Sequence, residues 1–148
     1  MSAPAPPRRD ALPGASEFRV HVQVPGRVAA ITPAVERVMA ALRTLPRVRG
    51  REFEIETALR EALSNAVRHG CREDPGKTVD VTVTADAGPG VEIVVSDPGR
   101  GFDPARVPSP TVGPNVYRHH GRGLYLIRQL MDEVTFARDG AEIRMRKR

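Results

Sequence analysis

Two polar residues, Glu61 and Asn65, stand four positions apart in the segment EALSNAVRHG. On an α-helix this spacing places both side chains on one face, next to each other. A carboxylate can accept a proton from a hydroxyl group, and a carboxamide oxygen can bind a hard cation such as Mg²⁺, which takes few protein ligands when phosphates supply the others. A solvated helix face can carry the same pair, so the pair indicates a site only where other motifs accompany it.

Two glycine-containing segments are motifs that accompany this pair. In DPGRG, Asp97 ends an apolar run, and Gly99 and Gly101 allow the backbone to approach a ligand closely. A carboxylate in that position can accept a hydrogen bond from an exocyclic amine such as that of adenine, although a plain turn has the same composition. GRGL, residues 121–124, precedes an apolar helical pattern, where free N–H groups and the helix dipole favour phosphate. A simple glycine-rich helix start would look the same.

Alternating apolar residues predict the strands that must carry these segments. EFRVHVQV, residues 17–24, has its valines on one face and polar residues on the other. TVDVTVTAD and VEIVVSD are separated by a Gly-Pro-Gly turn, which predicts a hairpin that ends on Asp97. VTFAR and AEIRMRK, joined by Asp139 and Gly140, predict a second hairpin.

Apolar residues at helical spacing predict three helices. The first covers about residues 33–45, with Thr32 as its cap and Pro33 as its first helical residue. The second follows Gly50, contains Glu61 and Asn65, and closes at Gly70. The third is LYLIRQLMD, which opens after Gly123.

These elements predict an α+β fold, a two-layer α/β sandwich with one mixed, mostly antiparallel sheet and its helices on one face. Residues 1–15 are rich in proline and alanine and are expected to form a disordered leader. Residues 16–148 then form a single domain. The proline-rich stretch at about 102–120 is expected to be a loop long enough to act as a lid over a ligand.

Composition narrows the possible partners and compartments. The net charge is +5, but the chain has no Trp, two Tyr and four Phe, so a nucleic-acid surface with stacking aromatics is not expected. The sequence contains no apolar run of about 18 residues and its first ten residues are not a secretory signal, so we expect a cytoplasmic protein without a membrane span. The single cysteine, Cys71, receives no chemical role.

The segments EALSNAVRHG, DPGRGFD and GRGLYLIRQLMDEV occur in this order and on these predicted elements. Together they resemble the ATP-binding family shared by gyrase, the large heat-shock chaperones, histidine kinases and the mismatch-repair ATPases, which has the Bergerat-type fold. Within that family, the sequence looks most like the small anti-sigma factor serine kinases of bacteria. The resemblance covers about residues 17–147.

The resemblance implies a role for each matching position. Asn65 would bind the Mg²⁺ of ATP, Glu61 would be the general base, and Asp97 would bind the adenine amine, with Gly99 and Gly101 shaping the pocket. The phosphates would contact backbone amides of the segment Gly121, Arg122, Gly123 and Leu124.

Other positions stay open at this point. Arg68 falls where histidine kinases often carry a phosphate-contacting lysine, but an exposed helical arginine is an equal alternative. His69 is also in a motif and could simply cap the helix. Lid residues could touch the triphosphate or be solvated: Arg106, Arg118, His119 and His120.

The implied function is that of an ATP-dependent serine/threonine protein kinase that phosphorylates an anti-sigma-factor antagonist and sequesters a sigma factor, as a homodimer. Two alternatives remain. One is a histidine-kinase-type catalytic domain acting in trans, because the predicted helix at 33–45 contains no histidine to accept phosphate. The other is a nucleotide-responsive binding module without kinase activity.

Overall fold

The computed structural model describes residues 18–85, 90–99 and 119–148, and for residues 119–122 it describes the backbone alone. The expected leader, Gly101 and the greater part of the expected lid, with Arg106 and Arg118, lie outside the described residues. So do the side chains of His119, His120 and Arg122.

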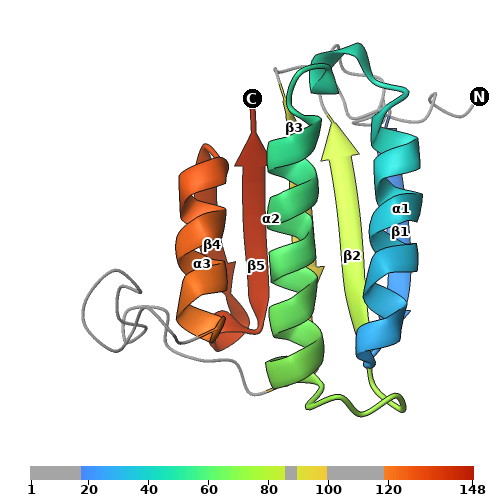
Figure 1. Ribbon diagram of the computed structural model, residues 1–148, viewed down its shortest axis with the longest axis vertical. Coiled ribbons are helices and arrows are strands. Elements are labelled where there is room, and N and C mark those ends of the chain that lie inside the picture. The colour runs from blue at the N-terminus through green and yellow to red at the C-terminus, as the bar shows by residue number, and fades with distance from the viewer. Residues whose placement is uncertain (1–17, 86–89, 100–118) are drawn as a thin grey trace, which may run out of the picture.

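Five strands form one sheet in the order β1-β2-β3-β5-β4 (Figure 1). Their bounds are Phe18–Pro25 for β1, Thr78–Ala85 for β2, Val91–Ser96 for β3, Glu133–Ala137 for β4 and Glu142–Lys147 for β5. Every pairing between these strands is antiparallel, so the sheet contains none of the parallel pairs that the predicted mixed sheet allowed. Both predicted hairpins, β2–β3 and β4–β5, are confirmed.

The three α-helices of the described residues cover one face of this sheet (Figure 1). They are α1, Ile31–Leu42, α2, Glu52–Asn65, and α3, His119–Leu130. The inward valines of the strands and the apolar stripes of the helices form one buried cluster. The predicted two-layer α+β fold is therefore confirmed. Among the described residues, no helix has the length and apolar character that crossing a bilayer requires.

The predicted start of the first helix is wrong. α1 begins at Ile31, after a short 3₁₀ turn at Val28–Ala30, and Thr32 is inside the helix and not its cap. The buried side chain of Ile31 extends the apolar stripe toward the N-terminus, and the hydroxyl oxygen of Thr32 accepts a hydrogen bond from Arg60 of α2 at 2.9 Å. Packing between α1 and α2 thus sets the boundary.

The predicted start of the third helix is also wrong, because α3 begins at His119 and runs through both glycines of the GRGL segment. Gly121 and Gly123 lower helix propensity, which favoured a later start. The buried residues Leu124 and Ile127 anchor α3 in the core, where it packs along α2. Tertiary packing outweighs the local preference of the glycines.

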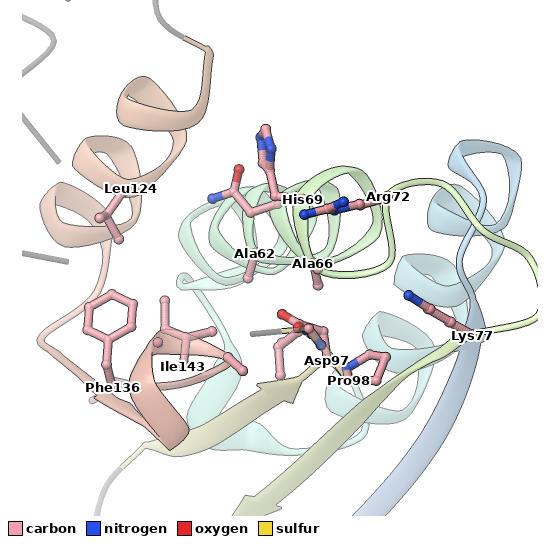
Figure 2. A pocket seen from close by; sticks show the side chains of 16 residues that line it. Ala62, Ala66, His69, Arg72, Lys77, Asp97, Pro98, Leu124, Phe136 and Ile143 are labelled. Carbon is pink, nitrogen blue, oxygen red and sulfur yellow. Dashed lines mark hydrogen bonds between the residues drawn. The ribbon is translucent and has the colours of Figure 1, made fainter. Parts of the chain in front are cut away.

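The end of α2 differs from a regular helix. After Asn65 the chain passes into a π-helical turn, Ala66–Gly70, in which the N–H of Cys71 donates to the carbonyl of Ala66 at 2.8 Å. This turn ends at Gly70, where the sequence predicted the helix to close. It lies over Asp97, which follows β3 (Figure 2).

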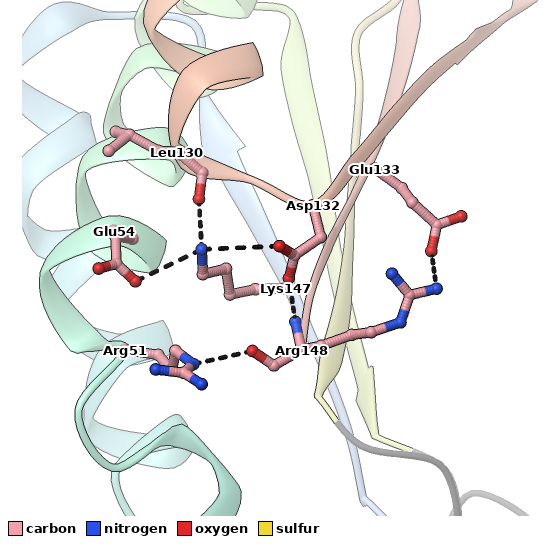
Figure 3. A network of polar contacts seen from close by, with 7 residues as sticks. All are labelled: Arg51, Glu54, Leu130, Asp132, Glu133, Lys147 and Arg148. Atoms are coloured by element: carbon pink, nitrogen blue, oxygen red, sulfur yellow. Dashed lines mark hydrogen bonds and ion pairs between the residues drawn. The ribbon is translucent and has the colours of Figure 1, made fainter.

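At the opposite end of the molecule, Lys147 joins the sheet to two helices (Figure 3). Its side chain is 14% exposed, and its Nζ donates to the carbonyl of Leu130, near the end of α3, at 2.7 Å. The carboxylates of Glu54 and Asp132 lie 3.5 and 3.9 Å from the same nitrogen. One cation therefore satisfies a helix C-terminal carbonyl and compensates two acidic side chains.

Replacing Lys147 with methionine should keep the apolar stem and remove this compensation. We expect Lys147→Met to lower the free energy of unfolding by about 1–3 kcal/mol, because it leaves half-buried acceptors without a donor. Urea denaturation checks this. The side chain of Arg144 is 49% exposed on the open face of the sheet, so Arg144→Met should change the free energy of unfolding by less than about 0.5 kcal/mol. Equal losses in the two variants would contradict the account.

Candidate functional site

A cavity of about 580 Å³ opens where the π turn of α2 meets the end of β3 (Figure 2). Its walls come from α2 and the turn after it, from β3, from α3 and from the β4–β5 hairpin. The lining residues are Ala62, Asn65, Ala66, His69, Gly70, Arg72, Lys77, Val95, Asp97, Pro98, Gly99, Leu124, Phe136, Gly140, Ala141 and Ile143. A cavity of this size, lined by apolar side chains together with a few convergent polar groups, is typical of a small-molecule site.

Asp97 holds a fixed position in this cavity. Its own N–H donates to the carbonyl of Ala141 at 2.9 Å, and the N–H of Gly99 donates to its Oδ1 at 2.7 Å. A Cβ on Gly70 would lie 2.2 Å from the Cγ of Asp97, so the π turn packs directly against the carboxyl group. Gly70 is therefore required for this close approach, a role that its reading as a helix terminator missed.

Burial raises the pKa of Asp97 above its ordinary value of 3.8. The hydrogen bond from Gly99 and the positive charge of Arg138, on the β4–β5 turn, both act in the opposite direction and are the smaller effects. The carboxyl group is thus poorly solvated, with only part of its accepting capacity used by the protein. It is suited to accept a hydrogen bond from a ligand.

Glu61 and Asn65 lie where α2 meets α3. A Cβ on Gly123 would be 2.8 Å from Oε2 of Glu61 and 3.4 Å from Nδ2 of Asn65, so both polar groups face this glycine. Among the described residues, Oδ1 of Asn65 is the only buried side-chain oxygen or nitrogen without a hydrogen-bond partner. A buried acceptor that the protein leaves unsatisfied is costly, and a ligand or cation would remove that cost.

The predicted site residues are only partly brought together. Asn65, Asp97, Gly99 and Leu124 line the cavity, and Glu61 lies beside it across Gly123. Gly121, Gly123 and Leu124 all lie in α3, with Gly121 nearest its N-terminus, where the N–H groups of a helix generally lack partners within it. Arg68 does not line the cavity, because its Nε donates to Oγ of Ser64 at 3.1 Å.

The structure adds residues that sequence reasoning left without a role. Arg72 and Lys77 line the cavity from the turn between α2 and β2, and Phe136 and Ile143 form an apolar wall on β4 and β5. The stretch CREDPGK reads as a polar connection, so nothing in its pattern indicates a site. His69, which the sequence left open between a site role and a helix cap, also lines the cavity.

A metal bound here would have few protein ligands. No group of three or more His, Cys, Asp or Glu side chains with the arrangement of a metal site exists within residues 18–85, 90–99 and 119–148. The unsatisfied oxygen of Asn65 and the nearby carboxylate of Glu61 fit a hard cation that takes its remaining ligands from phosphate and water.

Residues 23–147 match the family described as the histidine kinase-like ATPase domain. An anti-sigma F factor of Geobacillus thermodenitrificans is 38% identical over 85 residues, which are 55% of this chain and 57% of the relative. The serine-protein kinase RsbW of Staphylococcus aureus is 33% identical over 102 residues, 64% of either chain. The matches thus span less than two thirds of these relatives.

Among solved structures, the RsbU and RsbW domains of Rv1364c from Mycobacterium tuberculosis superpose with a TM-score of 0.62 at 17% identity. The match covers 88% of this chain and 32% of the other. At this level of identity, the likeness concerns the fold.

The buried carboxyl group of Asp97 makes stability depend on pH. Because its pKa is raised in the folded state, its contribution to stability is fully present below about pH 4 and is lost as the pH rises through the folded-state pKa. The Asp97→Asn variant keeps an acceptor for Gly99 without a charge. We expect its thermal midpoint to exceed that of the wild type by a margin that grows toward neutral pH. A margin that is constant with pH would refute this.

Proposed function

Since this chain belongs to the family of histidine kinase-like ATPase domains, we propose that its cavity binds Mg²⁺-ATP and that it phosphorylates a serine or threonine of a partner protein. The observation that carries the proposal is the pairing, in one cavity, of a poorly solvated carboxyl group at Asp97 with the unsatisfied buried oxygen of Asn65. The first suits the amine of a purine, and the second suits the cation that accompanies a polyphosphate.

Asp97 accepts the hydrogen bond from the exocyclic amine of adenine in this proposal. The N–H of Gly99 donates a hydrogen bond to the carboxylate of Asp97. The apolar side chains of Phe136 and Ile143 provide a surface for the base. Gly101, which lies outside the described residues, keeps its proposed place in the same pocket. Exclusion of water by these walls strengthens the single polar contact that identifies the base.

Asn65 would hold the Mg²⁺ through its unsatisfied oxygen, and the metal would neutralise the charge of the phosphates. Glu61 accepts the proton of the attacking serine or threonine hydroxyl group. The oxygen of that hydroxyl group forms a bond to the γ-phosphorus, and the bond between the γ-phosphorus and the oxygen of the departing ADP breaks. Gly123 lets the two side chains approach α3 closely. We propose that backbone N–H groups at the start of α3, at Gly121, contact the phosphates, since this part of the segment 121–124 lies nearest the N-terminus of the helix.

The names of the relatives, anti-sigma F factor and serine-protein kinase, indicate the biological setting. We propose that the chain is a cytoplasmic homodimer that sequesters a sigma factor and phosphorylates an anti-sigma-factor antagonist. The finer choice between a hydroxyl and an imidazole acceptor depends on Glu61, since a neutral hydroxyl gains more from a base than an imidazole does.

Substitutions at Glu61 and Asp97 separate binding from catalysis. We expect Asp97→Asn to weaken ATP binding at least tenfold, through loss of the charged acceptor for the amine. Glu61→Gln should bind ATP within about threefold of wild type and lose 10²-fold or more in phosphotransfer, which is the usual contribution of a general base. Calorimetric titration with Mg²⁺-ATP measures the first effect, and labelled phosphate transfer to the antagonist protein measures the second.

Glu56→Gln is the matched control, because Glu56 lies on α2 but forms ion pairs with Arg43 and Arg60 away from the cavity. It should bind and transfer like the wild type. ATP binding without phosphotransfer by the wild type would favour a nucleotide-responsive binding module. A phosphohistidine product would favour a histidine-kinase-type domain, and absence of ATP binding would refute the proposal.

A further inference from the structure

We propose that Arg138, on the β4–β5 turn, is a positioning residue for Asp97 and thereby strengthens the preference of the cavity for a purine with an amine over one with a carbonyl group in its place. This inference rests on the proposed contact between Asp97 and the amine of adenine. Arg138 does not itself line the cavity, so its effect on the base passes through Asp97.

The first argument is that the β4–β5 turn holds the backbone of Asp97. The N–H of Asp97 donates to the carbonyl of Ala141 at 2.9 Å, and the N–H of Ala141 donates to the carbonyl of Arg138 at 3.1 Å. Ala141 is buried and lines the cavity. The conformation of the turn therefore bears directly on the position of the carboxyl group.

The second argument is a side-chain contact from the same turn. Nη1 of Arg138 donates to Oγ of Ser96, the residue that precedes Asp97. In the sheet, Ser96 of β3 and Ala137 of β4 are both register partners of Glu142 on β5. The side chain of Arg138 thus reaches across β5 to β3. One turn holds two consecutive residues, Ser96 by a side chain and Asp97 by the backbone.

The third argument is the conformation of Arg138. Arg138 and Asp139 have φ of 52° and 56°, in the left-handed region that residues other than glycine rarely adopt. Asparagine or glycine would fit such a turn better. The contact with Ser96 gives a reason for an arginine at this position. Strained backbone positions of this kind cluster at ligand sites.

The fourth argument is electrostatic. Burial raises the pKa of Asp97, whereas the hydrogen bond from Gly99 and the positive charge of Arg138 lower it. The charged carboxylate is the better acceptor for an amine, and it repels a carbonyl oxygen. Arg138 therefore favours the form of Asp97 that distinguishes the two bases. Because Arg138 is exposed, solvent screens its charge and the expected effect is moderate.

The test compares ATP with inosine triphosphate (ITP), in which a carbonyl group replaces the amine. Arg138→Asn removes the guanidinium group, and asparagine tolerates the left-handed conformation of the turn. Calorimetric titration of this variant should show ATP bound about three- to tenfold more weakly and ITP within about twofold of wild type. Arg138→Lys keeps the charge and should recover part of the preference for ATP. Equal weakening of both ligands, or an unchanged preference, would overturn the inference.

A double-mutant cycle shows whether Arg138 acts through Asp97. In the Asp97→Asn background, Arg138→Asn should change the affinity for ATP by less than about twofold, because the carboxylate through which it acts is gone. Ser96→Ala removes the acceptor of the guanidinium group and should reduce the preference for ATP in the same direction as Arg138→Asn. An undiminished effect of Arg138→Asn in the Asp97→Asn background would contradict the proposed route.

Arg144→Asn is the matched control, because Arg144 is exposed on the same sheet but forms ion pairs with Glu92 and Glu142. It should bind ATP and ITP like the wild type. An unchanged midpoint of urea denaturation shows that each variant is folded. A wild type that prefers ATP irrespective of Arg138 overturns this inference alone, whereas a wild type that binds neither ATP nor ITP overturns the proposed function as well.

Discussion

The close contact between the π turn of α2 and the carboxyl group of Asp97 determines the geometry of the candidate site. Gly70 can lie against Asp97 only because it has no side chain. This contact joins the helical layer to the end of β3. It thereby determines how far Asn65 and His69 lie from the sheet. The position of the cavity, its depth and its polar groups follow from it.

Two polar groups make the site energetically unfavourable in the free protein. The carboxyl group of Asp97 is partly removed from water, with the N–H of Gly99 as its hydrogen-bond donor, and the oxygen of Asn65 is buried without a partner in the described part of the chain. A fold selected for stability alone would avoid both. Such costs are typical of binding sites, where a ligand supplies the missing partners.

The sequence predicted those elements whose side-chain pattern reflects one buried face. The valines of β1, β2 and β3 alternate because one face of the sheet is covered, so strands, hairpins and layers were readable. The starts of α1 and α3 were not, because contacts with α2 outweigh the preferences of Thr32, Pro33 and the glycines. Arg72 and Lys77 could not be recognised from a polar connection, since only the folded topology brings that turn to the cavity.

The π turn also explains why Arg68, which the family resemblance suggested as a phosphate contact, does not line the cavity. On a regular α-helix, residues three and four positions after Asn65 both lie near its face. A π-helical turn contains more residues than an α-helical turn, so each residue advances by a smaller angle about the helix axis. The third residue after Asn65 therefore does not reach the face on which Asn65 lies. Arg68 consequently turns away to Ser64, while His69, one position later, reaches the cavity. The π turn begins directly after Asn65, so the place of each later side chain has to be taken from the structure and not from its position in the sequence.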